Sequence, residues 1–237
     1  MKIKNSEIVF LVRSYNEATR IVEVLSGILG AWFSEILVID DGSTDDTANL
    51  LETHFSQKIH TVRHPMNRGW GAALETGFEY IRRYGKAEKW EYVVTFDADG
   101  QHDIENISRF IQAFEKDPTL DIVFWSRFVE KTDSNVPFIR RLILWGGKIF
   151  TSLISRMHLS DAHNGYRMMR RSVLDSLHLT MDGMEYASEL IDQIGIYGFH
   201  WSEVPVDIHY DAYTLKKWQR YGGPLRIAMR MIRKKFF

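Results

Sequence analysis

The amino-acid sequence predicts an α/β protein with a mostly parallel sheet that is covered by helices on both faces. Runs of β-branched and aromatic residues alternate along the chain with segments whose apolar residues recur every three or four positions. The runs are largely apolar, which is typical of parallel strands that are buried on both faces. This alternation of strand and helix favours parallel strands joined by helical crossovers.

Each expected element of the first half is bounded by a polar turn, a glycine or a proline. Strands are expected over residues 8–12, 36–39, 59–62, 92–96 and 121–125. Helices are expected between them, beginning at Glu17, after a cap at Ser43 or Thr44, after Gly69 and near Ile104. Gly30, Gly85 and Pro118 mark three of the helix ends, because glycine and proline favour such positions.

After residue 127 the pattern becomes less regular. Residues 140–156 form an amphipathic segment with basic flanks, and a helix is expected near residues 184–196. Residues 200–210 are expected to form an edge strand, because they contain Pro205. The basic, amphipathic residues 225–237 complete a C-terminal helical elaboration. No internal repeat or linker is visible, so we expect a single domain over residues 1–237.

The composition excludes several classes of protein. A chain of 237 residues with 45% hydrophobic and 26% charged residues is typical of a globular enzyme, and its net charge of -1 argues against a dedicated nucleic-acid binder. The absence of cysteine excludes disulfides, thiolate nucleophiles and cysteine metal sites. Asn5 and Glu7 come too early for a signal peptide, and Lys148 interrupts an apolar stretch too short to span a bilayer, so we expect a cytoplasmic location.

Three polar clusters directly follow expected strands, at residues 13–17, 40–43 and 97–102. Ligands of open parallel sheets bind beyond the carboxyl ends of the strands. We therefore expect these clusters to converge on one site at a single edge of the sheet.

The Asp97-Ala98-Asp99 cluster predicts a metal site. Side chains at positions i and i+2 of an extended backbone point the same way, so the two carboxylates are expected to face one spot. Their repulsion would raise a pKa unless a cation lies between them, and Mg²⁺ or Mn²⁺ would bind carboxylate oxygens there, with Gln101 as a further oxygen ligand. The alternative interpretation is an acidic turn after a strand, and His102 is similarly either a turn residue or a ligand.

Two further motifs are less specific. In Asp40-Asp41-Gly42-Ser43, one aspartate is expected to accept hydrogen bonds from a nucleobase or ribose, although these residue types are also common in turns and caps. Gly69-Trp70-Gly71 opens a helix, but Leu74 replaces the third glycine of a dinucleotide fingerprint and the segment does not follow the first strand. A nicotinamide cofactor is therefore not expected.

Taken together, six motifs resemble those of family 2 glycosyltransferases, in the order of that family. They are Ser14-Tyr15-Asn16-Glu17, residues 39–45 (IDDGSTD), Asn67-Arg68-Gly69-Trp70-Gly71, residues 97–102 (DADGQH), Ser126-Arg127-Phe128 and Asn164-Gly165-Tyr166-Arg167. The resemblance covers residues 8–220 and is greatest to bacterial relatives of dolichol-phosphate and polyprenyl-phosphate sugar transferases. It implies a GT-A fold, a nucleotide-diphosphate sugar donor, Mg²⁺ or Mn²⁺, and inversion at the anomeric carbon.

The resemblance also implies a role for individual residues. Residues 1–126 would bind the nucleotide sugar and residues 127–237 the acceptor. The positions implied for the nucleotide and the donor sugar are Tyr15, Glu17, Asp41, Asn67, Gly69, Asp97, Ala98 and Asp99, with Asp97, Asp99 and Gln101 at the metal. Arg127 and Lys217 match cationic positions near the donor diphosphate or the acceptor phosphate, and Arg167 and Glu189 lie in motifs near the acceptor.

The chemistry of sugar transfer fits these residue types. Negative charge develops on the departing diphosphate, so a metal ion together with Arg or Lys side chains would stabilise it. A hydroxyl acceptor would also need a carboxylate base, for which Asp161, Glu185 and Glu189 are candidates, whereas a phosphate acceptor is already anionic. Polyprenyl phosphate and a growing glycan both remain open as acceptors.

The sequence leaves two alternatives and one further interaction open. A sugar nucleotidyltransferase would carry a glycine- and arginine-rich loop after its first strand, which residues 13–17 lack. A non-catalytic nucleotide-sugar-binding scaffold would not need Asp97, Asp99, Arg127 and Arg167. The amphipathic residues 140–156 and 225–237 favour peripheral contact with an anionic membrane at its inner face, with a buried helix as the alternative for the first segment.

Overall fold

The computed structural model describes residues 2–100, 102–126, 157, 159–161 and 165–205, and its strands form one seven-stranded sheet. The strands are β1 (Ile8–Ser14), β2 (Ile36–Asp40), β3 (His60–Arg63), β4 (Tyr92–Asp97), β5 (Ile122–Ser126), β6 (Arg167–Arg170) and β7 (Trp201–Pro205). Their order in the sheet is β3-β2-β1-β4-β6-β5-β7. Among these described strands, β6 alone runs antiparallel to its neighbours, which confirms the mostly parallel sheet.

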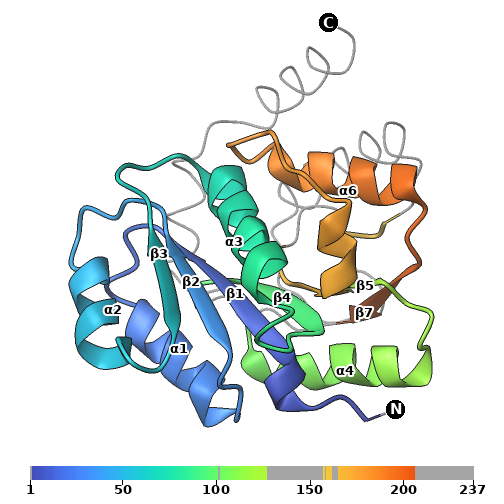
Figure 1. The fold of residues 1–237 in the computed structure, drawn as a ribbon, viewed down its shortest axis with the longest axis horizontal. Coiled ribbons are helices and arrows are strands. Elements are labelled where there is room, and N and C mark those ends of the chain that lie inside the picture. Colours follow the sequence, from blue (N-terminus) through green and yellow to red (C-terminus); the bar gives the residue numbers. More distant parts are fainter. Residues whose placement is uncertain (1, 101, 127–156, 158, 162–164, 206–237) are drawn as a thin grey trace, which may run out of the picture.

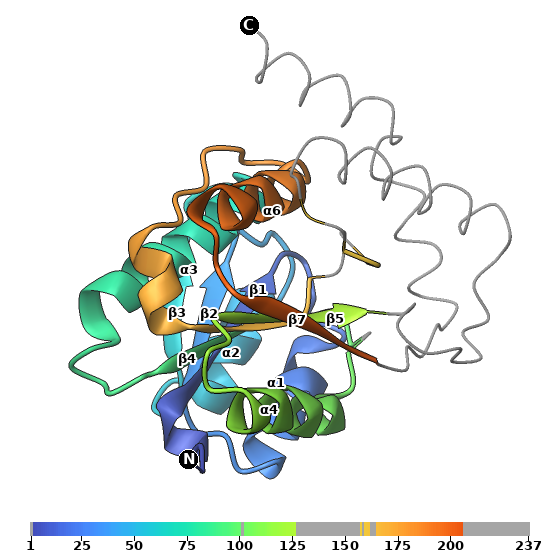
Figure 2. The same ribbon diagram turned by 90° about the vertical axis from the view of Figure 1, so that its right-hand side faces the viewer.

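Helices cover both faces of the sheet, as Figures 1 and 2 show. One face carries α1 (Ile21–Gly30), α2 (Thr47–Phe55) and α4 (Ile107–Lys116), and the other carries α3 (Trp70–Tyr84) and α6 (Tyr186–Tyr197). Short 3-10 helices lie at Asn5–Glu7, Ile104–Asn106 and Arg171–Asp175. The sheet is therefore the middle of three layers.

The two layers of helices explain the composition of the strands. In β1, Phe10 and Val12 pack with residues of α1 and α4, whereas Val9 and Leu11 pack with residues of α3 and α6. All seven residues of β1 and all five of β2 are buried. A strand in this position has no face in water, so its sequence is apolar throughout instead of alternating.

Strand β6 was not predicted, and it separates β4 from β5 in the sheet. Its four residues, Arg-Met-Met-Arg, contain neither a β-branched nor an aromatic side chain. β6 is held by its two neighbours, since Val94 and Val123 both pair with Met168. The strand therefore depends on tertiary pairing more than on its local sequence.

Two helices begin later than predicted. Residues 17–20 form a turn in which the backbone amides of Arg20 and Ile21 both donate to the Glu17 carbonyl oxygen, so α1 begins at Ile21. Helix α2 begins at Thr47, and the cap is neither Ser43 nor Thr44: the Asp45 carboxylate accepts a hydrogen bond from the Thr47 amide at 3.0 Å.

Strand β7 confirms the predicted edge strand over its described part. It pairs in parallel with β5 at one end of the sheet and ends at Pro205. Proline is tolerated there because an edge strand does not need every amide donor. Residues 206–210, and the amphipathic segments 140–156 and 225–237, lie outside the described residues.

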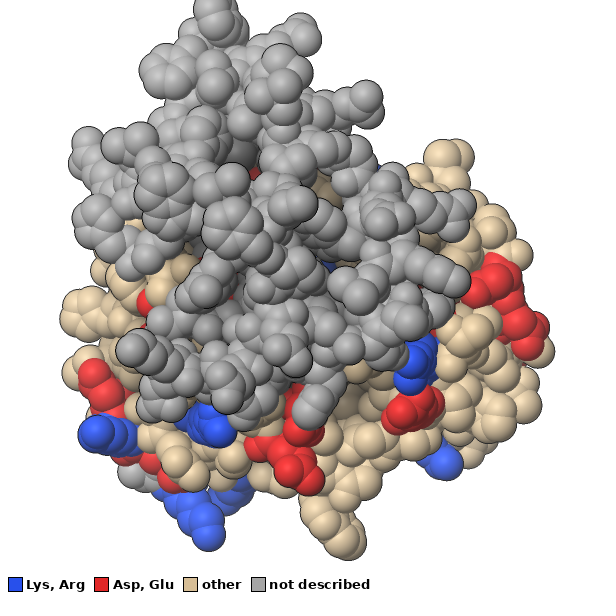
Figure 3. All heavy atoms as spheres, turned by 180° about the vertical axis from the view of Figure 1, so that it is seen from behind, with Lys and Arg blue, Asp and Glu red and all other residues tan. Residues whose placement is uncertain are grey.

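Charges of both signs are mixed on the described part of the face that Figure 3 shows. In the view of Figure 3, Lys and Arg side chains lie among Asp and Glu side chains without a continuous area of one sign in the part that is coloured by charge. No helix within the described ranges is both long enough and apolar enough to cross a bilayer.

Candidate active site

The three predicted polar clusters converge at the carboxyl ends of β1, β2 and β4. Ser14 lies opposite Asp40 in the β1–β2 pair, and Arg13 lies opposite Asp97 in the β1–β4 pair. The loops after β1 and β2 are also joined, because the Asn16 side-chain oxygen accepts from the Thr44 amide at 2.8 Å. The predicted convergence is therefore confirmed.

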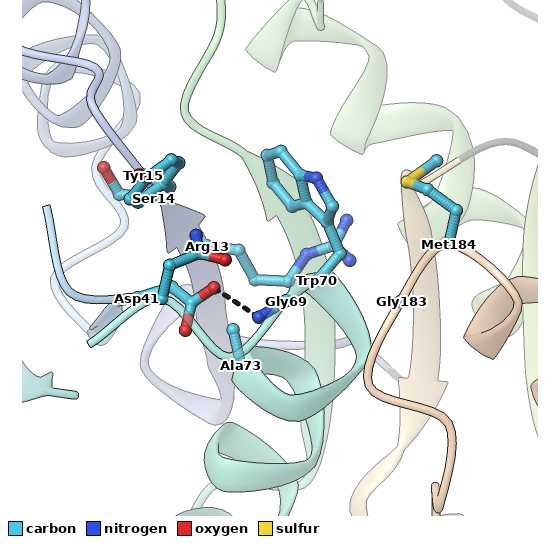
Figure 4. A pocket seen from close by; sticks show the side chains of 10 residues that line it. Arg13, Ser14, Tyr15, Asp41, Gly69, Trp70, Ala73, Gly183 and Met184 are labelled. Carbon is cyan, nitrogen blue, oxygen red and sulfur yellow. Dashed lines mark hydrogen bonds between the residues drawn. The ribbon is translucent and has the colours of Figure 1, made fainter. Parts of the chain in front are cut away.

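A cavity of about 230 Å³ opens at this edge of the sheet, between the β1 end and the start of α3. It is lined by Arg13, Ser14, Tyr15, Asp41, Asn67, Gly69, Trp70, Ala73, Gly183 and Met184. Figure 4 shows Tyr15 and Met184 on opposite sides of it, with Arg13 and Trp70 between them. Four of the predicted nucleotide-binding residues, Tyr15, Asp41, Asn67 and Gly69, thus line the same cavity.

Asp41 organises the wall of the cavity. Its buried carboxylate accepts hydrogen bonds from the backbone amides of Arg68 at 2.9 Å and Gly69 at 2.8 Å. His64 Nδ1 donates to the same carboxylate at 2.7 Å, and His64 Nε2 lies 2.9 Å from the Thr76 hydroxyl. Because three donors in the chain use this carboxylate, Asp41 shapes the loop before α3 as well as facing the cavity.

Glu17 and Ala98 lie behind the cavity and do not line it. Glu17 is fully buried, and its backbone amide donates to the Thr47 hydroxyl at 2.9 Å, which ties the β1 loop to the start of α2. Ala98 is buried, and its backbone amide donates to the Arg13 carbonyl oxygen at 3.2 Å. The predicted contacts of these two residues with the donor stay predictions.

The centre of the site holds an ion pair that sequence reasoning missed, between Arg13 and Asp97. The Arg13 side chain is 2% exposed, and its guanidinium carbon lies 5.2 Å from the Trp70 ring centre and 5.0 Å from that of Tyr186. These distances are typical of cation–π contacts. Arg13 therefore joins β1 to β4, α3 and α6.

The ion pair changes the electrostatics expected for the acidic cluster. Burial alone would raise the pKa of Asp97, but Arg13 and then His102 hold that pKa well below its usual range. Burial alone would likewise lower the pKa of Arg13, but Asp97 and Tyr186 raise it above its usual range. The cation expected beside Asp97 is thus already supplied by the chain.

The relation between Asp97 and Asp99 also differs from the prediction. Asp97 is the last residue of β4, but Asp99 lies in the turn that follows, so the alternation of an extended strand does not apply to the pair. The side chain of Asp97 is 20% exposed, and Asp99 is half-buried. Gln101, the third predicted ligand, lies outside the described residues.

The carboxylates at this edge of the sheet are ligands of the chemical type that a hard divalent ion prefers. Two carboxylates offer the oxygen ligands that Mg²⁺ and Mn²⁺ prefer. The described part of the chain contains no group of three or more Asp, Glu or His side chains that could hold a metal ion. Binding of a divalent ion by Asp97 and Asp99 stays a prediction.

His102 lies in an aromatic cluster beside the acidic residues. Its ring centre lies 4.5 Å from that of Trp125 and 5.2 Å from that of Tyr166, and its Nε2 atom is 3.8 Å from Asp97 Oδ2. The Tyr166 pKa is raised well above its usual value, chiefly by burial. His102 therefore packs among aromatic rings beside Asp97 and is not an exposed turn residue.

Glu189, which is predicted to lie near the acceptor, holds the loop before α6. Its carboxylate accepts from the backbone amides of Thr180 at 3.0 Å and Met181 at 2.8 Å, and from the Thr180 hydroxyl at 2.6 Å. Asp161 and Glu185, the other candidate bases, are both buried, and the Asp161 amide donates to Glu203 at 3.3 Å. A catalytic role for these carboxylates stays a prediction.

Arg167 is the predicted acceptor-side cation that the structure describes. It begins β6, and its side chain is 1% exposed. Burial, with a smaller effect of Arg13, lowers the pKa of Arg167, although Tyr186 and Asp97 partly offset this. Arg127 and Lys217, the other two predicted cations, lie outside the described residues.

Comparison with known proteins identifies the family. A model of the family described as glycosyl transferase family 2 matches residues 10–177, which include most of β1 and all of β2 to β6. The chain belongs to glycosyl transferase family 2. It is therefore a glycosyltransferase, which confirms the resemblance drawn from the six motifs.

Three similar proteins illustrate the relationship. The undecaprenyl-phosphate mannosyltransferase of Micrococcus luteus is 30% identical over 173 residues, covering 71% of this chain and 68% of that protein. The polyprenol monophosphomannose synthase of Mycolicibacterium smegmatis is 29% identical over 225 residues, covering 92% and 83%. The glucosyl-3-phosphoglycerate synthase of Mycobacterium tuberculosis, solved with Mn²⁺, UDP and glucosyl-3-phosphoglycerate, superposes with a TM-score of 0.64 at 16% identity, covering 95% and 77%. This last similarity confirms the GT-A fold.

The Arg13–Asp97 pair makes the stability of this glycosyltransferase dependent on pH. The folded-state pKa of Asp97 lies below its unfolded value of about 3.9, so the pair stabilises the fold fully above that pH. The stabilisation is lost as the pH falls from about 4 toward the folded-state pKa. Urea unfolding at pH 7 and at about pH 3.5 should show that the free energy of unfolding falls more for the wild type than for an Arg13→Met, Asp97→Ala double variant. An equal fall in the two proteins would show that the pair does not contribute to the pH dependence of stability.

Proposed function

We propose that this glycosyltransferase moves one sugar from a nucleotide-diphosphate sugar to a polyprenyl phosphate, with inversion and with Mg²⁺ or Mn²⁺ at Asp97 and Asp99. The observation that supports this most is the cavity at the ends of β1 and β2, whose lining residue Arg13 pairs with Asp97 at the end of β4. A growing glycan is the alternative acceptor.

The nucleotide would lie in the cavity between Tyr15 and Met184. Tyr15 offers a ring on one side, and the loop of Asn67 and Gly69 offers polar groups along the cavity wall. Asp41 holds that loop through the Arg68 and Gly69 amides, so the loop is positioned before a ligand binds. We infer that this preorganised wall contacts the base and ribose.

The diphosphate would lie toward the β4 end, where the chain places its acidic and basic groups together. A divalent ion bound there would neutralise charge on the departing diphosphate. Asp97 is kept ionised by Arg13, and Asp99 follows it in the turn, so the chain offers the ion negatively charged oxygen ligands. Arg167 would bind an anionic substrate group from the neighbouring strand.

Two observations favour a phosphate acceptor. They are the names of the similar proteins and the hydrogen bonds that the candidate base Glu189 already accepts. Two of the similar proteins are named for polyprenyl or undecaprenyl phosphate. A phosphate acceptor attacks as an anion and needs no base, whereas a glycan hydroxyl does need one. Because Glu189 already accepts three hydrogen bonds from the loop that it holds, its geometry favours a positioning role. Contact with a membrane through residues 140–156 and 225–237 would accompany a lipid acceptor.

Replacing Asp99 by alanine tests the donor and metal assignment. We expect Asp99→Ala to weaken Mn²⁺-dependent binding of the preferred UDP-, GDP- or dTDP-sugar by about tenfold or more, measured by titration calorimetry. Asp46→Ala is the matched control, because Asp46 is exposed and lies near the same edge without lining the cavity. Equal donor binding by the wild type and Asp99→Ala would contradict the metal role.

A further inference from the structure

We propose that Arg13 and Arg167 together form a buried subsite for a phosphoryl group, at the junction of β1, β4 and β6. The ligand class is a phosphate or diphosphate oxyanion, from the donor or from the acceptor. The inference deepens the proposed function, on which it rests, by adding Arg13 to the groups that bind substrate.

The register of the sheet places both guanidinium groups over the same spot. Arg13 lies opposite Asp97, and Arg167 lies opposite Thr95, two residues earlier on β4. Side chains at i and i+2 of a strand share a face, as do directly paired residues of neighbouring strands. Arg13, Asp97 and Arg167 therefore all lie on the face that α3 and α6 cover.

The groups around the two arginines leave them short of acceptors. Arg13 donates to Asp97 through Nη2, but its Nε and Nη1 atoms have no hydrogen-bond partner among the described residues. None of the three nitrogen atoms of Arg167 has one in good geometry there either, although the Tyr186 side chain interacts electrostatically with both arginines. Both side chains are at most 2% exposed.

The net charge of these buried side chains also favours a bound anion. Among the side chains that the structure describes here, Arg13 and Arg167 lie beside Asp97, and these three together carry one net positive charge. An uncompensated buried cation is costly, and such a group is expected to have a paired anion or a bound ligand. Arginine has the planar fork of donors that matches phosphate oxygens.

The position of the two arginines connects them to the substrate cavity. Arg13 lines that cavity and stacks against Trp70, which also lines it. Gly165 precedes β6 closely, and a Cβ atom on it would lie 3.2 Å from Arg13 Nη2 and 2.5 Å from Asp97 Oδ2. Glycine at position 165 thus leaves the space beside this ion pair free of a side chain of its own.

The Arg167→Met variant tests the subsite, because a ligand-binding role and a structural role predict opposite results. We expect the unliganded variant to be at least as stable to urea as the wild type, since methionine removes a buried charge without a partner. We also expect the affinity for inorganic pyrophosphate or for farnesyl phosphate, measured by calorimetry in EDTA, to fall by about tenfold or more. Arg83→Met is the control for net charge, because Arg83 is exposed.

The ligands distinguish the two sources of the phosphoryl group. Loss of pyrophosphate binding alone would assign the subsite to the donor, and loss of farnesyl phosphate binding alone, with farnesol as control, would assign it to the acceptor. Arg167→Lys keeps the charge without the fork, so it should bind more weakly than the wild type but more tightly than Arg167→Met. Unchanged binding of both ligands by Arg167→Met, whatever its stability, would overturn the subsite.

The same titrations separate this inference from the proposed function. Binding of a nucleotide sugar with Mn²⁺ by the wild type tests the proposed function without reference to Arg167. A wild type that binds pyrophosphate through Arg167 but binds no nucleotide sugar would leave the subsite intact and contradict the function.

Discussion

Asp97→Ala is expected to lower the free energy of unfolding by about 3–5 kcal/mol, in addition to abolishing sugar transfer. The reason is Arg13, whose side chain is 2% exposed and whose hydrogen-bonded carboxylate partner is Asp97. Removing one member of a buried pair leaves the other charge without compensation. Urea unfolding of the protein without metal or substrate measures this effect directly.

Two control variants separate the ion pair from metal binding. The Arg13→Met, Asp97→Ala double variant removes both charges and should regain most of the lost stability, because apolar replacement of a buried pair is often close to neutral. Asp99→Ala should cost less stability than Asp97→Ala, since Asp99 is half-buried in a turn. If Asp97→Ala were as stable as the wild type, the structural role assigned to the pair would be wrong.

Gly71→Ala is expected to destabilise the fold by about 3 kcal/mol and to weaken donor binding. Gly71 lies in the first turn of α3, and its amide donates to the Asp182 carbonyl oxygen at 2.8 Å. A Cβ atom there would overlap the Met181 carbonyl oxygen and lie 2.8 Å from Tyr186 Cβ. Backbone on one of the two sides must move, and the loop that follows carries Gly183 and Met184 of the cavity wall.

Gly27→Ala is the matched control for that change. Gly27 lies within α1, and a Cβ atom on it would meet no atom within 4 Å. Alanine in a helix interior should therefore stabilise the protein by about 0.5–1 kcal/mol. Thermal unfolding and calorimetry of both variants check the pair of expectations, and a Gly71→Ala protein with wild-type stability and donor affinity would contradict the packing described here.

The sequence predicted most of the sheet because buried parallel strands have a strong local signal. Ile36–Asp40 and Tyr92–Asp97 are apolar runs that end in aspartate, and both strand and site could be located from them. β6 has no such signal, since two arginines flank two methionines and its pairing partners lie far away in the chain. The starts of α1 and α2 were predicted too early. The polar residues before each helix resemble a helix start in sequence, but in the structure Glu17 and Asp45 make turn contacts that precede the helices.

The site was predicted in part for a similar reason. Aspartates that follow strands identified the edge where Asp41 and Asp97 lie, since strand order alone brings them together. The partners of these aspartates could not be predicted. Arg13 reads as the first residue of a polar turn, and His64 as an ordinary residue before a proline, yet one pairs with Asp97 and the other with Asp41. Such pairings depend on packing between strands and helices and leave no local pattern.

The most direct test of the central claim is the product formed from a nucleotide sugar and a polyprenyl phosphate. Purified protein is incubated with UDP-, GDP- and dTDP-sugars, farnesyl or undecaprenyl phosphate and Mn²⁺, and the anomeric configuration of the product is determined by NMR. The account predicts a glycosyl lipid phosphate of inverted configuration that is not formed in EDTA or by Asp99→Ala. Formation of the same product at an undiminished rate in EDTA and by Asp99→Ala, or its formation with retained configuration, would contradict the account.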